Sequence, residues 1–189
     1  MIHPFNSSLA FSKFYLEHNY DFTGQTVIDA TVGNGHDTAW LLEKVSPAGR
    51  VIGFDIQAQA IESTREKLKN FDNLELFQDG HQNLLAYPYD DLACVLYNLG
   101  YLPKGDKNIA TRSETTIESI RAASQLLKVG GVIMIIAYPG HEEGRAEAQA
   151  LESHLSTYPQ REFQCWKVAF INQKNNPPIL YCLEKRRVK

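Results

Sequence analysis

One stretch near the start of the chain constrains the fold more than any other. Residues 27–38 read Val-Ile-Asp-Ala-Thr-Val-Gly-Asn-Gly-His-Asp-Thr, a short apolar strand that enters a glycine turn and then opens a helix. A strand that stops at two closely spaced glycines leaves backbone N–H groups beside the positive end of a helix. The stretch therefore predicts an α/β fold that binds a cofactor at the carboxyl edge of a parallel sheet.

The positions of glycines and acids narrow the choice of cofactor. A dinucleotide fingerprint has a third glycine three residues after the second, where this chain has Thr38. A dehydrogenase is therefore the less favoured alternative. Instead, Asp29 lies inside the strand before Gly33 and Gly35, and Asp55 ends the next expected strand. This combination resembles the motif of the Rossmann-like (class I) methyltransferases, which bind S-adenosylmethionine (SAM).

Composition describes a single domain that spans residues 1–189. The hydrophobic content of 43% and charged content of 22% are those of a globular protein, and a net charge of −3 argues against non-specific binding of long duplexes. Cys94, Cys165 and Cys182 form no Cys-x-x-Cys pair. We therefore expect reduced thiols in a cytoplasmic protein, with no metal site. The start of the chain lacks the pattern of a signal peptide, and no apolar run is long enough for a membrane span, so we expect no membrane partner.

Alternating strand and helix patterns predict a doubly wound, mostly parallel seven-stranded sheet. The last two expected strands have no helix between them, so one strand should be antiparallel. The helix before the first strand either covers the cofactor end of the sheet or packs on the sheet. We expect strands at 26–31, 50–55, 74–78, 92–97, 132–137, 163–171 and 179–184, helices at 6–20, 36–45, 58–70, 113–127 and 142–157, with Ser7 or Ser8 and Ser113 as caps, and a turn at 128–131.

Polar or glycine-rich residues follow five of these strands, whose carboxyl ends should meet at one edge of the sheet. The class I layout implies that the glycine turn passes beneath SAM and that an acid accepts hydrogen bonds from its ribose. His81 has a second interpretation as a capping or surface residue. The resemblance assigns Asp29, Asn34 and Asp37 to the methionine end of SAM, Asp55 and Gln57 to the ribose, and Asp79 and His81 to the adenine, with Gly33, Gly35 and Thr38 completing the turn.

The end of the fourth strand, Asn98-Leu99-Gly100-Tyr101, bears on the reaction. Methyltransferases that act on exocyclic base amines often carry Asn/Asp-Pro-Pro-Tyr there, in which oxygen atoms orient the amine and the aromatic ring stacks on the base. The Asn and the aromatic residue match, but both prolines are missing. The departure leaves room for another nitrogen nucleophile. Turn capping by Asn98 and simple packing by Tyr101 are the alternatives.

Five stretches together carry a narrower resemblance over essentially the whole chain. They are Asp-Ala-Thr-x-Gly-Asn-Gly-x-Asp-Thr at 29–38, Phe-Asp-Ile-Gln at 54–57, Tyr-Asn-Leu-Gly-Tyr-Leu-Pro-Lys-Gly-Asp at 97–106, Lys-Val-Gly-Gly at 128–131 and Tyr-Pro-Gly-His at 138–141. The chain resembles the small family of rRNA methylases that includes MnmM-type tRNA methyltransferases. Those enzymes methylate the amine of 5-aminomethyl-2-thiouridine at the tRNA wobble position. The resemblance implies SAM as cofactor and the tRNA anticodon stem-loop as partner, and it leaves a homodimer open.

That activity would give particular residues roles in catalysis and substrate binding. Asn98 would orient the amine, and Tyr101 or Tyr138 would stack on the uracil. His141 is the candidate proton acceptor, with a loop histidine as the alternative. The candidates for RNA phosphate contact are Lys104, Lys107 and Arg112 beside the fourth strand, Arg145, and the tail residues Lys185, Arg186, Arg187 and Lys189, of which the tail is more simply explained as solvated charge.

Two other functions stay open. A methyltransferase that acts on rRNA or on a small molecule would share every cofactor feature described above. A regulatory module that binds SAM without turnover would need no amine-orienting group such as Asn98 beside the cofactor turn. The sequence therefore favours an enzyme.

Overall fold

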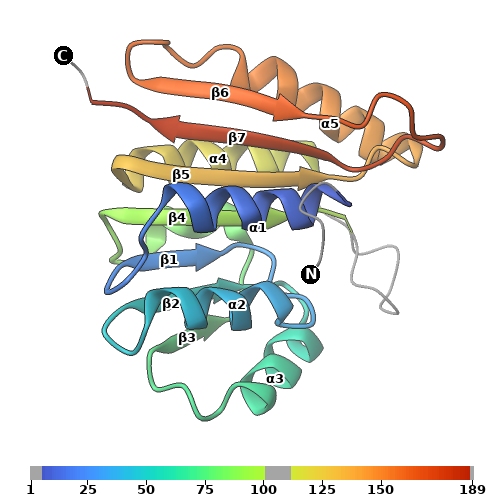
Figure 1. The fold of residues 1–189 in the computed structure, drawn as a ribbon. Helices are drawn as coiled ribbons and strands as arrows, with labels where there is room; N and C mark the ends of the chain where they lie inside the picture. The colour runs from blue at the N-terminus through green and yellow to red at the C-terminus, as the bar shows by residue number, and fades with distance from the viewer. Residues whose placement is uncertain (1–5, 101–111, 188–189) are drawn as a thin grey trace.

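The computed structural model describes residues 6–100 and 112–187 and contains a seven-stranded sheet (Figure 1). The strands are β1 (Thr26–Asp29), β2 (Arg50–Phe54), β3 (Leu74–Phe77), β4 (Leu92–Asn98), β5 (Leu127–Ala137), β6 (Phe163–Val168) and β7 (Ile179–Lys185). The helices are α1 (Ser8–Asn19), α2 (His36–Val45), α3 (Ala58–Lys67), the 3₁₀ helix η1 (His81–Ala86), α4 (Ser113–Leu126) and α5 (Glu142–Leu155). Tyr101, Lys104, Lys107 and Lys189 lie outside the described residues.

The sheet has the strand order β3-β2-β1-β4-β5-β7-β6. β7 runs antiparallel to both of its neighbours, and the remaining neighbouring strands pair in parallel. This arrangement confirms the predicted α/β fold class with one antiparallel strand. α1, α2 and α3 cover one face of the sheet, whereas α4 and α5 cover the other (Figure 1).

Two local predictions were wrong, and one element was not predicted. Residues 128–131 are not a turn before the fifth strand, because β5 already begins at Leu127, which pairs with Leu92 ahead of a register shift in β4. Ser113 is the first residue of α4 and not its cap; Arg112 holds that position without a side-chain hydrogen bond. The turn η1 was missed, because six mixed residues without a repeating apolar spacing carry no helical signal.

The core consists of two apolar clusters, one on each side of the sheet. β4 contributes residues to both clusters, because its side chains are buried on both faces of the sheet, as expected of a central parallel strand. Cys94 and Cys182 are buried, Cys165 is partly buried, and all three are free thiols. No helix in the described part of the chain combines the length and the apolar character required to cross a membrane.

α1 packs on the sheet. The Ser7 side chain accepts a hydrogen bond from the N–H of Ala10, which confirms the predicted cap. The Ser8 hydroxyl donates to the carbonyl of Pro178 at 2.6 Å, and the Tyr15 hydroxyl donates to Glu184 at 2.9 Å. Burial, together with this bond to Glu184, raises the pKa of Tyr15, so the hydroxyl stays a donor. The helix is therefore fixed against β7 at more than one point.

Candidate active site

The glycine turn lies where the direction of winding changes. From β1 the chain passes to β2 on one side, and β4 lies on the other side of β1. Ligands of open α/β sheets bind at such a switch point. Gly33 and Gly35 have φ values of +51° and +70°. A Cβ at Gly35 would lie 2.7 Å from the Thr64 side chain, so this position needs glycine for its backbone angle and for its close packing.

Asp55 joins the glycine turn to the end of β2. One of its oxygens accepts the N–H of Gly33 and the other accepts the N–H of Gln57, both at 2.9 Å. Each carboxylate oxygen keeps a further lone pair for a ligand. The neighbouring Ile56, to which the sequence alone gave no role, leaves 55% of its surface exposed. The sequence shows an apolar residue directly after the strand-ending acid, but only the structure shows that this residue is exposed.

Asp29 lies beneath the turn with only 1% of its surface exposed. It accepts hydrogen bonds from the Thr38 hydroxyl at 2.6 Å and from the N–H of Thr31 at 3.1 Å. Burial raises the pKa of Asp29 to about 7, and the negative charge of Asp37 adds to this effect. Thr38, in place of a third glycine, therefore supports the buried acid.

A chain of polar contacts crosses the site from α1 to the end of β5. Lys13 pairs with Oδ1 of Asp37 at 2.7 Å, and Oδ2 of Asp37 accepts from the Asn98 amide at 3.2 Å. The Tyr138 hydroxyl donates to Oδ1 of Asn98 at 2.7 Å, and the Asn98 backbone N–H donates to the Thr31 hydroxyl at 2.8 Å. Three predicted residues, Asp37, Asn98 and Tyr138, are therefore in direct contact. Nothing in the sequence linked Lys13 to them.

The residues after β3 mainly hold η1. Asp79 accepts from the Gly80 N–H and the Asn83 amide at 2.7 Å and from the Tyr87 hydroxyl at 2.8 Å. Burial opposes ionisation of Asp79, but these bonds outweigh it and lower the pKa. His81 is buried, which lowers its pKa to about 4, and its ring meets Tyr97 edge-on. Adenine contact by Asp79 and His81 stays a prediction.

His141 is the N-cap of α5. Its Nδ1 accepts the N–H of Gly144 at 3.1 Å, and Glu143 lies 3.5 Å away. A ring nitrogen that accepts a hydrogen bond carries no proton, so the neutral ring here is protonated at Nε2. Taking a second proton at Nδ1 would break the cap. The hydrogen bond from Gly144 therefore supports a structural role for His141 as a helix cap. Proton acceptance by His141 stays a prediction.

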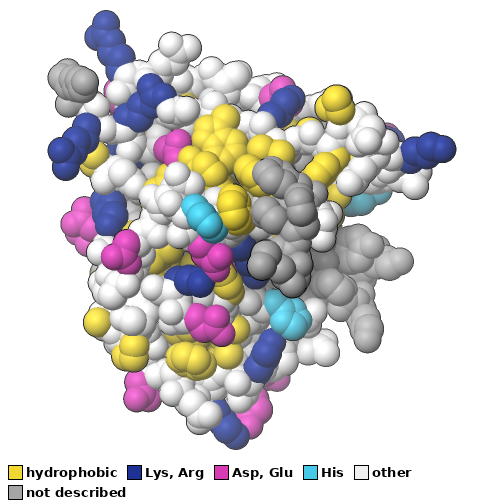
Figure 2. Space-filling view, in the orientation of Figure 1, with side chains coloured by type: hydrophobic (Ala, Val, Ile, Leu, Met, Phe, Trp, Pro, Cys, Tyr) yellow, Lys and Arg dark blue, Asp and Glu magenta, His cyan; other side chains and the backbone are white. Residues whose placement is uncertain are grey.

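Some of the basic residues predicted to contact RNA are exposed, whereas Lys185 is hydrogen-bonded within the protein. Arg112 and Arg145 are exposed, as RNA-contacting side chains must be. Lys185 donates to the carbonyls of Ser124 and Leu127, at the end of α4, so it stabilises a helix terminus. Figure 2 shows basic and acidic side chains interspersed on the face drawn, so that face presents no field of a single sign.

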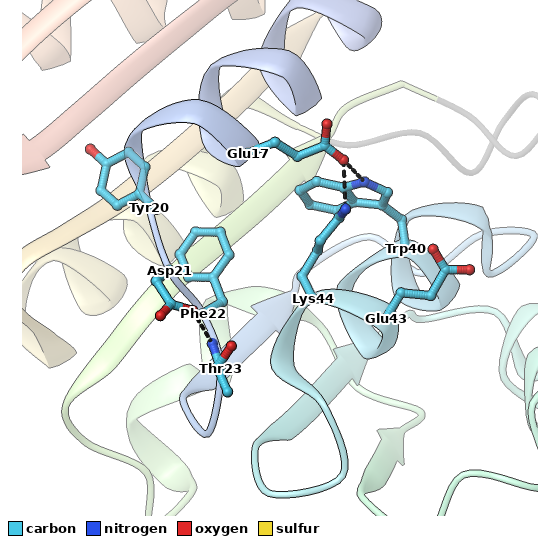
Figure 3. Close-up of a pocket in the computed structure, with 8 residues that line it drawn as sticks. All are labelled: Glu17, Tyr20, Asp21, Phe22, Thr23, Trp40, Glu43 and Lys44. Carbon is cyan, nitrogen blue, oxygen red and sulfur yellow. Dashed lines mark hydrogen bonds and ion pairs between the residues drawn. The ribbon is translucent and has the colours of Figure 1, made fainter.

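A shallow pocket of about 370 Å³ lies between the end of α1 and α2 (Figure 3). Glu17 in this pocket accepts from the indole N–H of Trp40 at 3.1 Å and pairs with Lys44 at 2.7 Å. None of the predicted cofactor residues lines it. This pocket is therefore separate from the glycine turn, where the cofactor site stays a prediction. The pocket is lined by Glu17, Tyr20, Asp21, Phe22, Thr23, Trp40, Glu43 and Lys44.

Known proteins share this fold and much of this sequence. A crystal structure of a "putative rRNA-methylase" from Clostridium thermocellum has a TM-score of 0.92 and 44% identity, covering 98% of this chain and 99% of that one. A crystal structure of "a putative methyltransferase" from Streptococcus mutans, in complex with S-adenosylhomocysteine (SAH), has a TM-score of 0.86 and 33% identity, covering 98% of this chain and 99% of that one.

One relative carries a more specific name. The chain is 36% identical over 175 residues to the chloroplastic tRNA (mnm(5)s(2)U34)-methyltransferase of Arabidopsis thaliana. The match covers 86% of this chain but only 64% of that protein. The family model described as "Putative rRNA methylase" matches residues 51–184, which is well over half of the chain. The chain therefore belongs to the rRNA methylase family.

Proposed function

We propose that this protein transfers a methyl group from SAM to the aminomethyl nitrogen of 5-aminomethyl-2-thiouridine at the wobble position of tRNA. The observation that carries the proposal is the Asn98 amide, held between Tyr138 and Asp37 at the end of β4. The name of the Arabidopsis relative supports the same substrate.

The residues around the glycine turn fit SAM. Asp55 keeps lone pairs for the two ribose hydroxyls after binding the turn, and exposed Ile56 offers an apolar surface to a purine ring. Asp37 supplies negative charge for an ammonium and a sulfonium, and the buried Asp29 supports the turn beneath it. When bound, SAM supplies an electrophilic methyl group. The SAH complex of the Streptococcus mutans relative supports this assignment.

Asn98 can aim the nucleophile because its own orientation is fixed. Its Nδ2 faces Asp37 and its Oδ1 faces Tyr138, so the amide cannot flip without losing both bonds. Oδ1 keeps a second lone pair that can accept an N–H of the substrate amine. Such a bond would hold the lone pair of the amine in line with the methyl group, and alignment of this kind lowers a barrier by several kcal/mol. Tyr138 would also present its ring to the uracil.

The product amine must lose a proton after attack. We assign this proton to His141, because the unprotonated nitrogen of a neutral imidazole can accept a proton. The assignment requires Nδ1 to release the Gly144 N–H. A wild-type rate for His141→Ala at every pH would remove the catalytic role and leave the cap.

Transfer of the methyl group to undermodified tRNA tests the proposal. tRNA that carries 5-aminomethyl-2-thiouridine would be incubated with the protein and SAM, and its nucleosides analysed by mass spectrometry. We expect conversion to 5-methylaminomethyl-2-thiouridine with the wild type and with Asn70→Ala, which changes an exposed asparagine in the turn after α3, and none with Asn98→Ala.

The family description gives a second candidate substrate, because it refers to rRNA. Ribosomal RNA would therefore be assayed in parallel with tRNA. Methyl transfer into rRNA alone, with tRNA unchanged, would overturn the proposed substrate while leaving the enzyme class intact. Arg112 and Arg145 are the exposed cations proposed to contact the anticodon stem-loop, so tRNA binding should weaken as salt rises.

A further inference from the structure

The proposed function does not yet explain why Lys13 lies in the polar chain at the site. We propose that its ammonium group binds the carboxylate at the amino-acid end of SAM, while Asp37 faces the ammonium at that end. This inference rests on the proposed function, because it concerns the same cofactor.

The contacts of Lys13 leave it able to take a second anion. Its Nζ lies 2.7 Å from Oδ1 of Asp37, and 24% of the Lys13 side chain and 12% of the Asp37 side chain are exposed. An ammonium group carries three N–H donors. Among the described residues, Asp37 is the single hydrogen-bonding or ion-pairing partner of Nζ, so N–H donors remain for a ligand. Since the pair is largely shielded from water, such a contact would be screened only weakly by salt.

The charges at the site explain why a cation such as Lys13 beside Asp37 would favour SAM binding. Asp29 and Asp37 lie close enough for the charge of one to raise the pKa of the other. The amino-acid end of SAM carries an ammonium and a carboxylate. Acidic groups alone, Asp37 above all, would attract the first group and repel the second, because like charges disfavour each other at short range. Adding Lys13 gives the site one positive group for the carboxylate.

The fold presents Lys13 in a fixed position. α1 is held to β7 through Tyr15 and Glu184, and to α2 through the Glu17–Trp40 hydrogen bond (Figure 3). The Lys13 ammonium lies 5.4 Å from the centre of the Trp40 ring, which supports the side chain from below. A cation that is already ordered loses less entropy when it binds a ligand.

Two ligands that differ by one carboxylate test the inference. The first is S-adenosylhomocysteine (SAH). The second is its decarboxylated analogue, the 3-aminopropyl thioether of 5′-deoxyadenosine, which keeps the ammonium. Calorimetric titration of the protein should show that Lys13→Met weakens SAH binding by about 10- to 100-fold, the range for hydrogen bonds to charged groups. Binding of the analogue should change less than about threefold, because the lost contact is absent from it.

Lys44→Met is the matched control. Lys44 also lies over Trp40, at 5.6 Å from the ring centre, and also forms an ion pair at 2.7 Å, with Glu17. This variant should bind both ligands as the wild type does. Lys13→Arg, which keeps the charge, should recover most of the affinity for SAH, and urea denaturation would show that each variant is folded.

Each other outcome overturns the inference. Equal weakening of both ligands by Lys13→Met would mean that Lys13 acts only by holding Asp37. Unchanged affinity for both would mean that Lys13 does not serve the cofactor at all. If the wild-type protein binds neither ligand, the proposed function itself fails, and this result is distinct from the other two.

Discussion

The Tyr138 hydroxyl donates a hydrogen bond to Oδ1 of Asn98 at 2.7 Å, which joins the end of β5 to the end of β4. Burial raises the pKa of Tyr138, so the hydroxyl remains protonated and continues to donate near neutral pH. The bond selects one of the two orientations that an asparagine amide can adopt, and it thereby turns the Asn98 N–H donor towards Asp37. Lys13 of α1 pairs with Asp37 in turn, so these side chains join α1, α2, β4 and the end of β5.

Tyr138→Phe tests the value of that orientation. The ring remains for stacking, but the amide loses its donor, so we expect kcat to fall about five- to tenfold, which corresponds to one neutral hydrogen bond. The affinity for SAH should stay unchanged. Tyr158→Phe, which loses a bond of 3.1 Å to the Ser124 hydroxyl away from the site, should leave kcat at the wild-type value. An equal fall in both variants would contradict a role for Tyr138 in orienting Asn98.

Gly35→Ala should destabilise the protein and weaken SAH binding. The residue has φ of +70°, and its new Cβ would lie 2.7 Å from the Thr64 side chain. Gly24→Ala isolates the cost of the backbone angle from the cost of the steric clash, because Gly24 has φ of +72° but no atom within 4 Å of a built Cβ. The left-handed angle alone costs about 1–2 kcal/mol. Urea denaturation should therefore show a larger loss for Gly35→Ala than for Gly24→Ala; equal losses would mean that Thr64 moves aside freely.

Asp29→Asn should change how stability depends on pH. The pKa of Asp29 is about 7 in the folded protein and about 3.9 in an unfolded chain. Between these values the folded state keeps a proton that the unfolded state has lost, so the free energy of unfolding should fall as pH rises from about 4 to 7 and then level off. The slope from this residue is at most about 1.4 kcal/mol per pH unit.

The measurement for Asp29 is urea denaturation of wild type and variant across that pH range. The difference between the two should shift in favour of Asp29→Asn as pH rises, because asparagine brings no buried charge. Its oxygen can still accept the Thr31 N–H, and its NH2 group can donate to the Thr38 hydroxyl oxygen in place of the present bond. Parallel curves for the two proteins would show that Asp29 does not titrate in this range.

Glu184→Ala should loosen α1. Glu184 accepts hydrogen bonds from Tyr15, from Tyr20 and, at 3.3 Å, from the Trp166 indole. Leaving partly buried donors unpaired costs about 1–3 kcal/mol in the free energy of unfolding. Glu66→Ala, which removes an exposed ion pair with Lys69, should cost less than about 1 kcal/mol. Thermal or urea unfolding compares the two; similar losses would mean that the Glu184 contacts do not anchor the helix.

The sequence by itself determined the order of the strands and α-helices and the place of the glycine turn after β1. Apolar runs such as β4 mark buried strands whatever surrounds them, and glycines at 33 and 35 permit backbone angles that other residues resist. The acids at 29 and 55 could be placed beside the glycine turn, because Asp29 ends one strand of that pattern and Asp55 directly follows another. These signals are local, so they are visible without the fold.

Only the tertiary structure decided which side chains meet. The sheet order places β4 between β1 and β5, and this is why Asn98 lies beside Asp37 on one side and Tyr138 on the other. The packing of α1 on β7 brings Lys13 to Asp37, and the cap of α5 occupies Nδ1 of His141. Residues far apart in the chain have no pattern that records their contact, because the contact arises from how the sheet and helices pack.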